Sequence, residues 1–479
     1  MTIQEYYASL IMEAMEGEAR GDFEGTADIA ERYKYEHLQA VFMNRDSIEN
    51  GEALYQKMYR TAMQTCEKHL KEKFARHEVI KVAFMSYSAA QWPAESLYRD
   101  MEKDPRFQPY IIVSPLLNRD IENRVSGYNQ TLSWYYENGY KVYGGAGKTY
   151  RSWNELGGEP DLVIHLSSWF ECIPECQQFL TLPWKCANLY IPYGMQVGDN
   201  DDHSYVKSYV FNKEFANMMW RIYTDSKITL KGYEEYGLIR GINVRYSGYL
   251  KMDELMKPRT FKKQEIDSLW KCPGDRSKYK KIIIAPHYTV GNEGLFLSST
   301  FRENVWFWLY LAEKYQDSVS FLFKPHPNLR GAAVQYGLFS SYEEYDRYFA
   351  SWNDLPNARA IDESKYIDYF LTSDAMILDS GSFIGEYMYV HKPVLFLTRP
   401  EQRFTDLGKS VLNTYYRTPG WDLAEIERFI NEVVIAGDDP MKPEREKVFE
   451  EYLDYHRLNG KMAHEIVFDD IVSAMKNGN

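Results

Sequence analysis

The sequence predicts an α/β fold made of two successive series of strands and helices. Short apolar runs rich in β-branched residues alternate with helical stretches over residues 78–191, and again over residues 281–436. Continuous apolar runs separated by helices are typical of parallel sheets covered on both faces. A polar stretch at 252–280 separates the two series. We therefore expect two similar domains, with a boundary near residue 250.

The expected organisation of the chain has four parts. Residues 1–76 show helical spacing with charged faces and no convincing strand, which predicts a helical extension. This extension is either an interaction or membrane-surface element or a cap on the next domain, and we favour the cap. Residues 77–250 and 251–440 are the two expected α/β domains. Residues 441–479 are charged and helical, and by analogy with other two-domain folds we expect them to brace the N-terminal domain.

Composition excludes some classes of function. The formal net charge of the 479-residue chain is −13, which argues against nucleic-acid binding because that requires a basic surface. Five cysteines, an odd number in a long chain, indicate a reducing compartment. The N-terminus lacks the pattern of a signal peptide, and no run of about 18 apolar residues occurs. We expect a cytoplasmic protein, with peripheral association at the inner membrane face and the oligomeric state left open.

The most informative pattern lies between Ser373 and Tyr387. An apolar strand runs into Asp379-Ser380-Gly381-Ser382 and then into a helix. Ligands of open α/β sheets bind at the carboxyl ends of strands, and the N–H groups of a helix N-terminus suit a phosphate. Gly381 allows close approach of the backbone, and the serines add hydroxyl donors. The alternative is an ordinary helix cap, since Asp and Ser are preferred there without any ligand.

Two further strand ends in the same half carry histidines. Lys324-Pro325-His326-Pro327 follows one strand, and its prolines make the loop rigid. In its cationic form, His326 would stabilise a pyrophosphate leaving group, with added charge from Lys324. His287 follows a third strand and is expected at the same edge of the sheet. The alternative for each histidine is a hydrogen bond within a structural loop.

The first half offers less specific candidates. Glu95, His165 and Tyr193 follow predicted strands and carry groups that can serve as a general base, but spacing distinguishes none of them. The acidic run at 199–203 has ligands suited to a divalent cation, although a solvated loop is the preferred explanation. We expect no metal site and no tightly bound cofactor.

The segments that carry a family resemblance are 323–327, 373–387 and 392–394. Together they resemble the CDP-glycerol glycerophosphotransferase family of teichoic-acid and capsule synthesis. The family's His-Pro loop corresponds to His326-Pro327, and its Asp-Tyr-Ser-Ser turn corresponds to residues 379–382. The resemblance covers residues 281–400 best and is absent from the first 76 residues. It implies the GT-B fold, in which two Rossmann-like halves face each other across a cleft.

The resemblance also implies a reaction. Glycerol phosphate, or a related polyol phosphate or sugar, would move to a hydroxyl of a growing glycan or lipid-linked glycan. The donor would be CDP-glycerol, CDP-ribitol or a UDP-sugar, bound by the second half, with the acceptor on the first. The residues implied for the donor are Asp379, Ser380, Gly381 and Ser382 at the pyrophosphate, His326 and Lys324 at the leaving nucleotide, and Glu386 at the ribose. His287 would line the phosphates or act as the base, and Glu95 is a further candidate for catalysis.

The sequence departs from the family in the first half. The family carries a His-Gly-Thr-Pro loop whose histidine is the proposed base, and the nearest segment here is Tyr193-Gly194-Met195. The base, the acceptor and the transferred group therefore stay open. The Asp-Ser-Gly-Ser turn followed by Glu386 is also similar to the non-hydrolysing UDP-sugar 2-epimerases. The alternatives are a GT-B glycosyltransferase that uses a UDP- or CMP-sugar, an epimerase-like enzyme, or an inactive scaffold.

Overall fold

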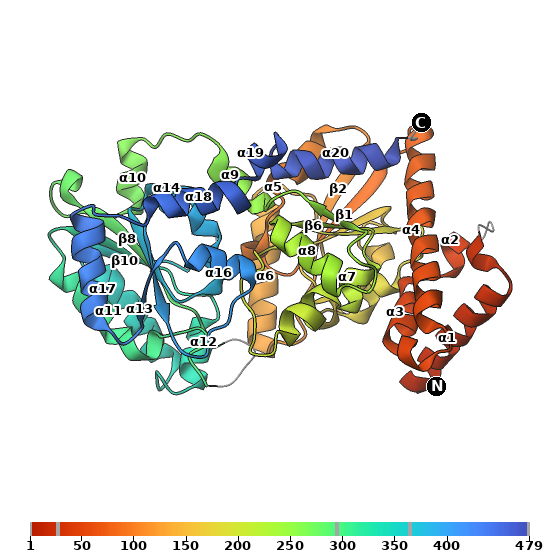
Figure 1. Ribbon diagram of the computed structural model, residues 1–479, viewed down its shortest axis with the longest axis horizontal. Helices are drawn as coiled ribbons and strands as arrows, with labels where there is room; N and C mark the ends of the chain where they lie inside the picture. The colour runs from red at the N-terminus through yellow and green to blue at the C-terminus, as the bar shows by residue number, and fades with distance from the viewer. Residues whose placement is uncertain (1, 25–28, 293–296, 363–365, 477–479) are drawn as a thin grey trace. The chain divides into compact units, whose positions relative to one another are not determined.

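The computed structural model describes residues 2–24, 29–292, 297–362 and 366–476. The chain forms two compact units, and each is described by itself. Unit 1 comprises Met1–Gly194, Lys207–Lys251 and Leu458–Asn479, and unit 2 comprises Met195–Val206 and Met252–Arg457. Each unit contains a parallel sheet with helices beside it, which confirms the predicted α/β fold class (Figure 1).

Unit 1 is built on a sheet with the strand order β3-β2-β1-β4-β5-β6-β7. The strands are β1 (Ile80–Ser86), β2 (Phe107–Val113), β3 (Val142–Gly144), β4 (Leu162–His165), β5 (Ala187–Tyr190), β6 (Arg221–Thr224) and β7 (Val244–Tyr246). All neighbouring strands pair in parallel. The central strands are apolar and buried because helices cover both faces of such a sheet. The helices that accompany it are α5 (Glu95–Lys103), α6 (Ile121–Glu137), α7 (Glu214–Met218), α8 (Lys227–Tyr236) and α20 (Ala463–Met475).

The N-terminal helices belong to the same compact unit as this sheet. They are α1 (Ile3–Ala19), α2 (Ile29–Arg32), α3 (Tyr35–Asn44) and α4 (Gly51–Ala75). Figure 1 shows α1, α3 and α4 side by side. The buried Tyr35 hydroxyl donates to the Cys186 carbonyl (2.7 Å), and the Tyr55 hydroxyl donates to the Asn217 carbonyl (2.8 Å). Since these bonds join the helices to backbone around the sheet, the extension is part of the core of unit 1.

Unit 2 is built on a second parallel sheet, with the order β10-β9-β8-β11-β12-β13. The strands are β8 (Lys280–Ala285), β9 (Val319–Phe323), β10 (Ala358–Ala360), β11 (Ala375–Leu378), β12 (Val394–Thr398) and β13 (Tyr416–Pro419). The helices are α9 (Asp253–Met256), α10 (Lys263–Leu269), α11 (Phe301–Lys314), α12 (Leu329–Gln335), α13 (Tyr342–Asp354), α14 (Ile367–Thr372), α15 (Gly381–Ile384), α16 (Asp406–Leu412), α17 (Leu423–Arg428) and α18 (Lys442–Tyr452), and α19 (Tyr455–Asn459) contains the last unit boundary. A core of large apolar side chains, among them Trp308, Phe323 and Trp352, packs against one face of the sheet.

Two segments belong to a different unit from the one expected for them from the sequence. Residues 195–206 belong to unit 2, where the Thr405 N–H donates to the Val197 carbonyl (3.0 Å) and the Thr405 hydroxyl donates to the Gln196 carbonyl (2.8 Å). Helix α18 also belongs to unit 2 and contacts α16, whereas α20 contacts α4 and α5 in unit 1. Of the expected C-terminal brace, only the part from Leu458 onward lies in unit 1.

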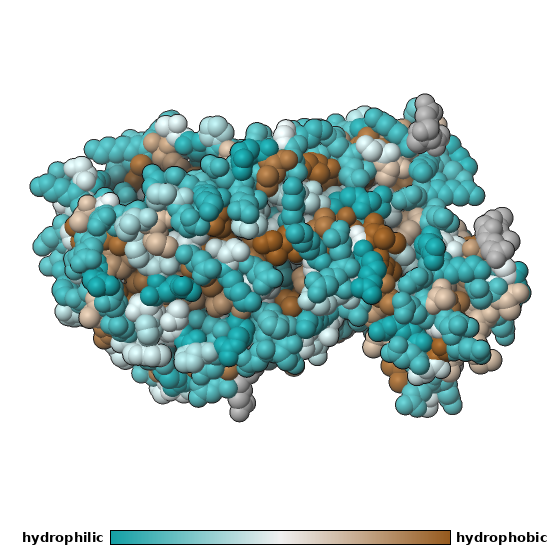
Figure 2. Space-filling view, in the orientation of Figure 1, coloured by the Kyte–Doolittle hydropathy of each residue, from teal (hydrophilic) through white to brown (hydrophobic). Residues whose placement is uncertain are grey.

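The face of the molecule displayed in Figure 2 is mainly polar. Among the described residues, no helix combines the length and the hydropathy that a bilayer crossing requires. Figure 2 shows hydrophilic residues over most of the displayed face, with apolar residues scattered between them. Scattered apolar residues of this kind are normal on protein surfaces.

A buried aspartate fastens α4 to the sheet of unit 1. Asp161 precedes β4 and accepts hydrogen bonds from His69 Nε2 (2.7 Å) and Lys73 Nζ (2.7 Å). It also accepts the backbone N–H of Lys81 in β1 (2.8 Å). Burial by itself raises the pKa of this carboxyl, but the donors outweigh burial and lower the pKa below its ordinary value. The charged form of Asp161 is therefore part of what holds helix and sheet together.

Replacing Asp161 by Asn should lower the free energy of unfolding of unit 1 by about 2–4 kcal/mol, because the half-buried Lys73 loses its charged partner and the donors around this buried position lose an accepting oxygen. Asp374 provides a matched control, since it precedes β11 and accepts the backbone N–H of Lys281 in β8 (2.8 Å). Its side chain is 36% exposed, so Asp374→Asn should cost about 1 kcal/mol or less. Urea unfolding combined with hydrogen exchange of the strand amides measures both losses. Equal losses would contradict the anchoring role of Asp161.

Candidate functional site

The predicted donor residues lie where the strand order of unit 2 reverses, between β8 and β11. His287 follows β8, His326 follows β9 and Asp379 follows β11. Because these strands are parallel neighbours, their carboxyl ends lie at one edge of the sheet. Ligands of open α/β sheets bind at such reversal points. The structure thus brings these three residues together.

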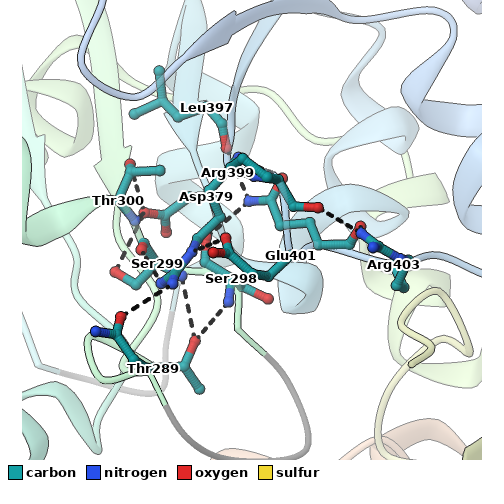
Figure 3. A network of polar contacts seen from close by, with 12 residues as sticks. Thr289, Ser298, Ser299, Thr300, Asp379, Leu397, Arg399, Glu401 and Arg403 are labelled. Atoms are coloured by element: carbon teal, nitrogen blue, oxygen red, sulfur yellow. Dashed lines mark hydrogen bonds and ion pairs between the residues drawn. The ribbon is translucent and has the colours of Figure 1, made fainter. Parts of the chain in front are cut away.

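Asp379 ties the loops at this edge to one another (Figure 3). It is 2% exposed, and its Oδ1 accepts the backbone N–H of His287 (2.6 Å). Its Oδ2 accepts the backbone N–H (2.5 Å) and the hydroxyl (2.9 Å) of Thr300, and the hydroxyl of Ser299 (3.4 Å). Burial raises the pKa of Asp379 to about 6, and these hydrogen bonds limit the rise. With both oxygens engaged by protein donors, Asp379 positions the loop around His287.

The proton on His287 can be assigned from its neighbours. Nδ1 lies 2.9 Å from the Thr289 hydroxyl, which itself accepts the backbone N–H groups of Ser298 (2.9 Å) and Ser299 (3.3 Å). Both lone pairs of that hydroxyl are used, so its own proton points to Nδ1 of His287. The ring proton therefore lies on Nε2. Burial lowers the pKa of His287 to about 4, which leaves the ring neutral near pH 7.

This arrangement affects the roles expected for His287. A ring with its proton on Nε2 and its Nδ1 engaged presents a hydrogen-bond donor. A general base needs an available lone pair within reach of the acceptor hydroxyl. The geometry therefore favours the phosphate-lining role of His287 over the role of base.

His326 lies against His287, with the ring centroids 5.2 Å apart and the planes inclined at 65°. Its backbone N–H donates to the Pro286 carbonyl (3.0 Å), which joins the loops after β8 and β9. Its Nδ1 accepts the backbone N–H of Asn328 (3.1 Å). A proton on Nδ1 would break this bond, so the geometry fits a neutral ring protonated on Nε2. This differs from the cationic form expected from the sequence.

Lys324 and Glu386 belong to a buried cluster beside the histidines. The Lys324 ammonium lies 5.4 Å from the ring centroid of Tyr366 and 5.6 Å from that of Phe383, in the geometry of cation–π contacts. The Tyr366 hydroxyl donates to the Glu386 carboxylate. Lys324 is 5% exposed and Glu386 is 3% exposed. The predicted phosphate and ribose contacts of these residues remain proposals.

The Ser380-Gly381-Ser382 turn caps a short helix. The Ser380 hydroxyl accepts the backbone N–H of Ser382 (3.2 Å), which makes Ser380 the N-cap of α15. Helix α15 is only one turn long and is followed by a 3-10 helix, Glu386–Val390, so its dipole is small. Gly381 is half-buried and Ser382 is exposed. Ser380 therefore acts as the helix cap that the sequence offers as the alternative to phosphate binding. A phosphate contact through Gly381 and Ser382 is a proposal.

The segment that enters unit 2 at Met195 packs against this turn. A Cβ at Gly385 would clash with Met195 Sδ, so the Met195 side chain lies directly against this glycine. A Cβ at Gly381 would lie 3.8 Å from Val197 Cγ2, which is ordinary contact. The residues directly after Tyr193-Gly194 are therefore neighbours of the predicted phosphate turn.

Arg399 and Gln402 belong to the same edge, although no sequence motif marks them. Arg399 Nη1 donates to the Ser299 carbonyl (3.1 Å), and Gln402 Nε2 donates to the Ser298 carbonyl (2.8 Å) (Figure 3). Arg399 also pairs with Glu401 (2.9 Å). These side chains hold the loop before α11 from the side of β12. Their position directly after a predicted strand is the signal that points to them.

The candidates in unit 1 have structural partners. Glu95 begins α5 and accepts hydrogen bonds from Trp92 Nε1 (2.9 Å) and Arg99 Nε (3.0 Å). His165 is buried, and its Nε2 pairs with Asn188 Oδ1 (2.9 Å). Burial lowers the pKa of His165 to about 4. These contacts favour structural roles for both Glu95 and His165.

The acidic run at 199–203 folds on itself. Asp199 Oδ2 lies 2.5 Å from His203 Nδ1, and the Asp202 carboxylate accepts the backbone N–H of Ser204 (3.0 Å). Within the described part of the chain, no group of three or more His, Cys, Asp or Glu side chains is arranged to hold a metal ion. The acidic run is therefore held by local hydrogen bonds and by Arg403, whose carbonyl accepts the Asp199 N–H (3.0 Å) and whose side chain pairs with Asp201 (2.5 Å).

Comparisons with known proteins show the fold. No protein-family model matches the chain, and no curated protein matches it significantly. The wall teichoic acid polymerase TagF aligns with a TM-score of 0.53 and 13% identity, over 92% of this chain and 97% of that chain. A TagF variant soaked with CDPG aligns with a TM-score of 0.51 and 13% identity, over 92% and 98%. A UDP-GlcNAc 2-epimerase from Neisseria meningitidis, bound to UDP-GlcNAc, aligns with a TM-score of 0.49 and 16% identity, over 82% and 99%.

At these identities the similarity concerns architecture. The chain shares a GT-B-like fold with the teichoic acid polymerase, with a parallel sheet in each unit. Fold alone does not assign chemistry, because one fold hosts many functions. The function must therefore be argued from the residues at the edge of the unit 2 sheet.

Proposed function

We propose that this chain is a transferase that uses a nucleotide-linked donor. It moves glycerol phosphate, or a related polyol phosphate or sugar, from a CDP- or UDP-linked donor to a hydroxyl of a growing glycan. The observation that carries this proposal is the pair His287 and His326 at adjacent strand ends, with rings 5.2 Å apart. The fold likeness to TagF, a variant of which has been soaked with CDPG, makes CDP-glycerol the first donor to test.

The pair has the chemistry that a diphosphate requires. Each Nδ1 accepts a hydrogen bond from its own loop, so the proton of each neutral ring lies on Nε2, which would be the donor to a diphosphate. Donors that are oriented in advance need no reorganisation when charge develops on a leaving group. Lys324 adds positive charge from the loop that also carries His326. Gly381 and Ser382 would contact the pyrophosphate of the donor. Glu386 would contact its ribose.

With CDP-glycerol, the reaction balances as a phosphoryl transfer. The oxygen of the acceptor hydroxyl attacks the phosphorus of the glycerol phosphate group and forms a new P–O bond. The bridging P–O bond breaks, and CMP leaves with the electron pair. The hydroxyl proton passes to a base or to solvent. The histidines stabilise the charge that develops on CMP, which is the main contribution a protein makes to this type of transfer.

Mass spectrometry of the products tests the proposal. The purified chain is mixed with CDP-glycerol, CDP-ribitol or UDP-sugars and with short glycan acceptors. A product heavier by glycerol or ribitol phosphate, together with CMP, supports polyol-phosphate transfer. A product heavier by a hexose, together with UDP, supports sugar transfer from the same edge. An epimerised sugar nucleotide, or nucleotide binding without any product, would overturn the transferase proposal.

A further inference from the structure

The outward face of α11 carries an unusual set of side chains. Trp306 is 61% exposed and Tyr310 is 49% exposed. They lie one helical turn apart, a rise of about 6 Å along the axis. The other exposed side chains of this helix are all charged: Arg302, Glu303, Glu313 and Lys314. The face therefore presents aromatic rings among charges, without an exposed aliphatic residue.

Both rings are held by neighbours rather than left to rotate. Trp306 meets the ring of Tyr348 edge-on, with centroids 5.4 Å apart, and also contacts Phe339 (6.2 Å). Tyr310 stacks on Phe307, with centroids 5.8 Å apart. Rings fixed in this way lose little conformational entropy when a ligand stacks on them.

The exposed aromatic residues of α11 are connected to the candidate site through Tyr336. Tyr336 is 38% exposed, and its carbonyl accepts a hydrogen bond from Arg302 Nη2 (2.9 Å) at the start of α11. Its ring packs on Gly291, where a Cβ would lie 2.6 Å from Tyr336 Cε1. Gly291 stands two residues after Thr289, which holds Nδ1 of His287. A track of rings and charges therefore runs from the loop of the donor histidine along α11.

We infer that this track, formed by Tyr336, Arg302, Trp306 and Tyr310, is a docking surface for a saccharide chain. The inference rests on the proposed function, since it assigns a place on unit 2 to part of the glycan chain, whose reacting end the family resemblance places on the first half. Sugar rings have apolar C–H faces and polar hydroxyl rims. Exposed aromatic rings bordered by charged groups match both, because Trp and Tyr combine an apolar body with a polar tip.

The composition of the track argues against two other occupants. Protein interfaces are enriched in Trp, Tyr and Arg but depleted in Lys and Glu, whereas exposed Glu303, Glu313 and Lys314 lie beside the rings of this helix face. Anionic membranes attract clusters of basic residues, whereas Glu303 and Glu313 offset Arg302 and Lys314 here. A polar, ring-stacking ligand is the chemistry that remains.

Calorimetric titration with chitohexaose, cellohexaose and maltohexaose, without nucleotide, tests the docking surface. At least one probe should bind the wild-type chain, and Trp306→Ala and Tyr310→Ala should each weaken that binding by about tenfold. Trp421 is the matched control, since it is 57% exposed in the same unit but lies outside the track. Trp421→Ala should bind like the wild type. Melting temperatures identify any variant that fails to fold.

Three results distinguish the saccharide-docking surface from its alternatives. Failure of all probes to bind at millimolar concentration, or equal binding by the wild type and both track variants, would overturn the docking surface. Loss of binding to lipid vesicles in the Trp306 variant, without any saccharide binding, would assign the track to a membrane instead. If a saccharide binds through the track but no donor yields a product, the docking surface stands and the proposed transfer fails.

Discussion

Replacing His326 by alanine should lower turnover with the preferred donor about 10²–10³-fold, the range found when one oriented donor is removed from a site of developing charge. The reason is that His326 Nε2–H would no longer stabilise the leaving nucleotide. Steady-state kinetics with CDP-glycerol measure the loss. The fold should be retained, because the surrounding loop is also held by the backbone bond from residue 326 to Pro286.

Two further variants define the origin of this loss. His326→Gln keeps an N–H donor and should recover part of the turnover. His456→Ala removes an exposed histidine of the same unit and should behave like the wild type. Normal turnover by His326→Ala would show that the leaving group is stabilised elsewhere.

Replacing Asp379 by asparagine should destabilise unit 2 by about 2–4 kcal/mol and lower turnover at least tenfold. An amide has one accepting oxygen, so its NH₂ group must face the N–H of either His287 or Thr300. The loop that orients His287 would then loosen. Thermal unfolding and kinetics measure the two effects. Asp374→Asn, at the opposite edge of the same sheet, should leave turnover unchanged, and the same result for Asp379→Asn would contradict the positioning role.

The pH dependence of stability gives the same residue a second test. The pKa of Asp379 in the folded state is about 6, above its ordinary value of 3.8. The contribution of this group to stability is therefore lost as the pH rises from about 4 to 6. His287 and His165 have folded pKa values of about 4, below their ordinary 6.5, so the stability they contribute is lost as pH falls through this window. Each effect is at most about 3 kcal/mol. Asp379→Asn should therefore show a steeper loss of stability on acidification than the wild type.

Many residues at the carboxyl edge of the unit 2 sheet could be predicted from the sequence, because they come directly after its strands. Apolar runs such as 282–284 mark parallel strands, and the residues after them must lie at one edge of the sheet. That rule predicts that His287, His326 and Asp379 lie together, as the structure has them. It could not show that Asp379 holds a loop, because its partners Ser299 and Thr300 lie about 80 residues away in a stretch without a motif.

Other features depend on packing that local patterns do not encode. The transfer of residues 195–206 to unit 2 rests on bonds to Thr405, some 200 positions later. The protonation of His326 depends on the backbone N–H of Asn328, which a loop sequence does not reveal. The position of Glu95 after a strand allows a role as base, but the sequence does not reveal that Trp92 Nε1 donates to its carboxylate.

The affinity for CDP-glycerol, measured by calorimetry between pH 5.5 and 8.5, tests the central claim that neutral imidazole N–H groups hold the donor diphosphate. Affinity of the wild type should change by no more than about twofold over this range, because a proton on either ring would break the hydrogen bond that its Nδ1 accepts. His326→Ala should bind about tenfold more weakly at every pH, as expected for a lost hydrogen bond to a charged group. A fall of tenfold or more as pH rises through 6–7, or equal affinity of variant and wild type, would contradict the account.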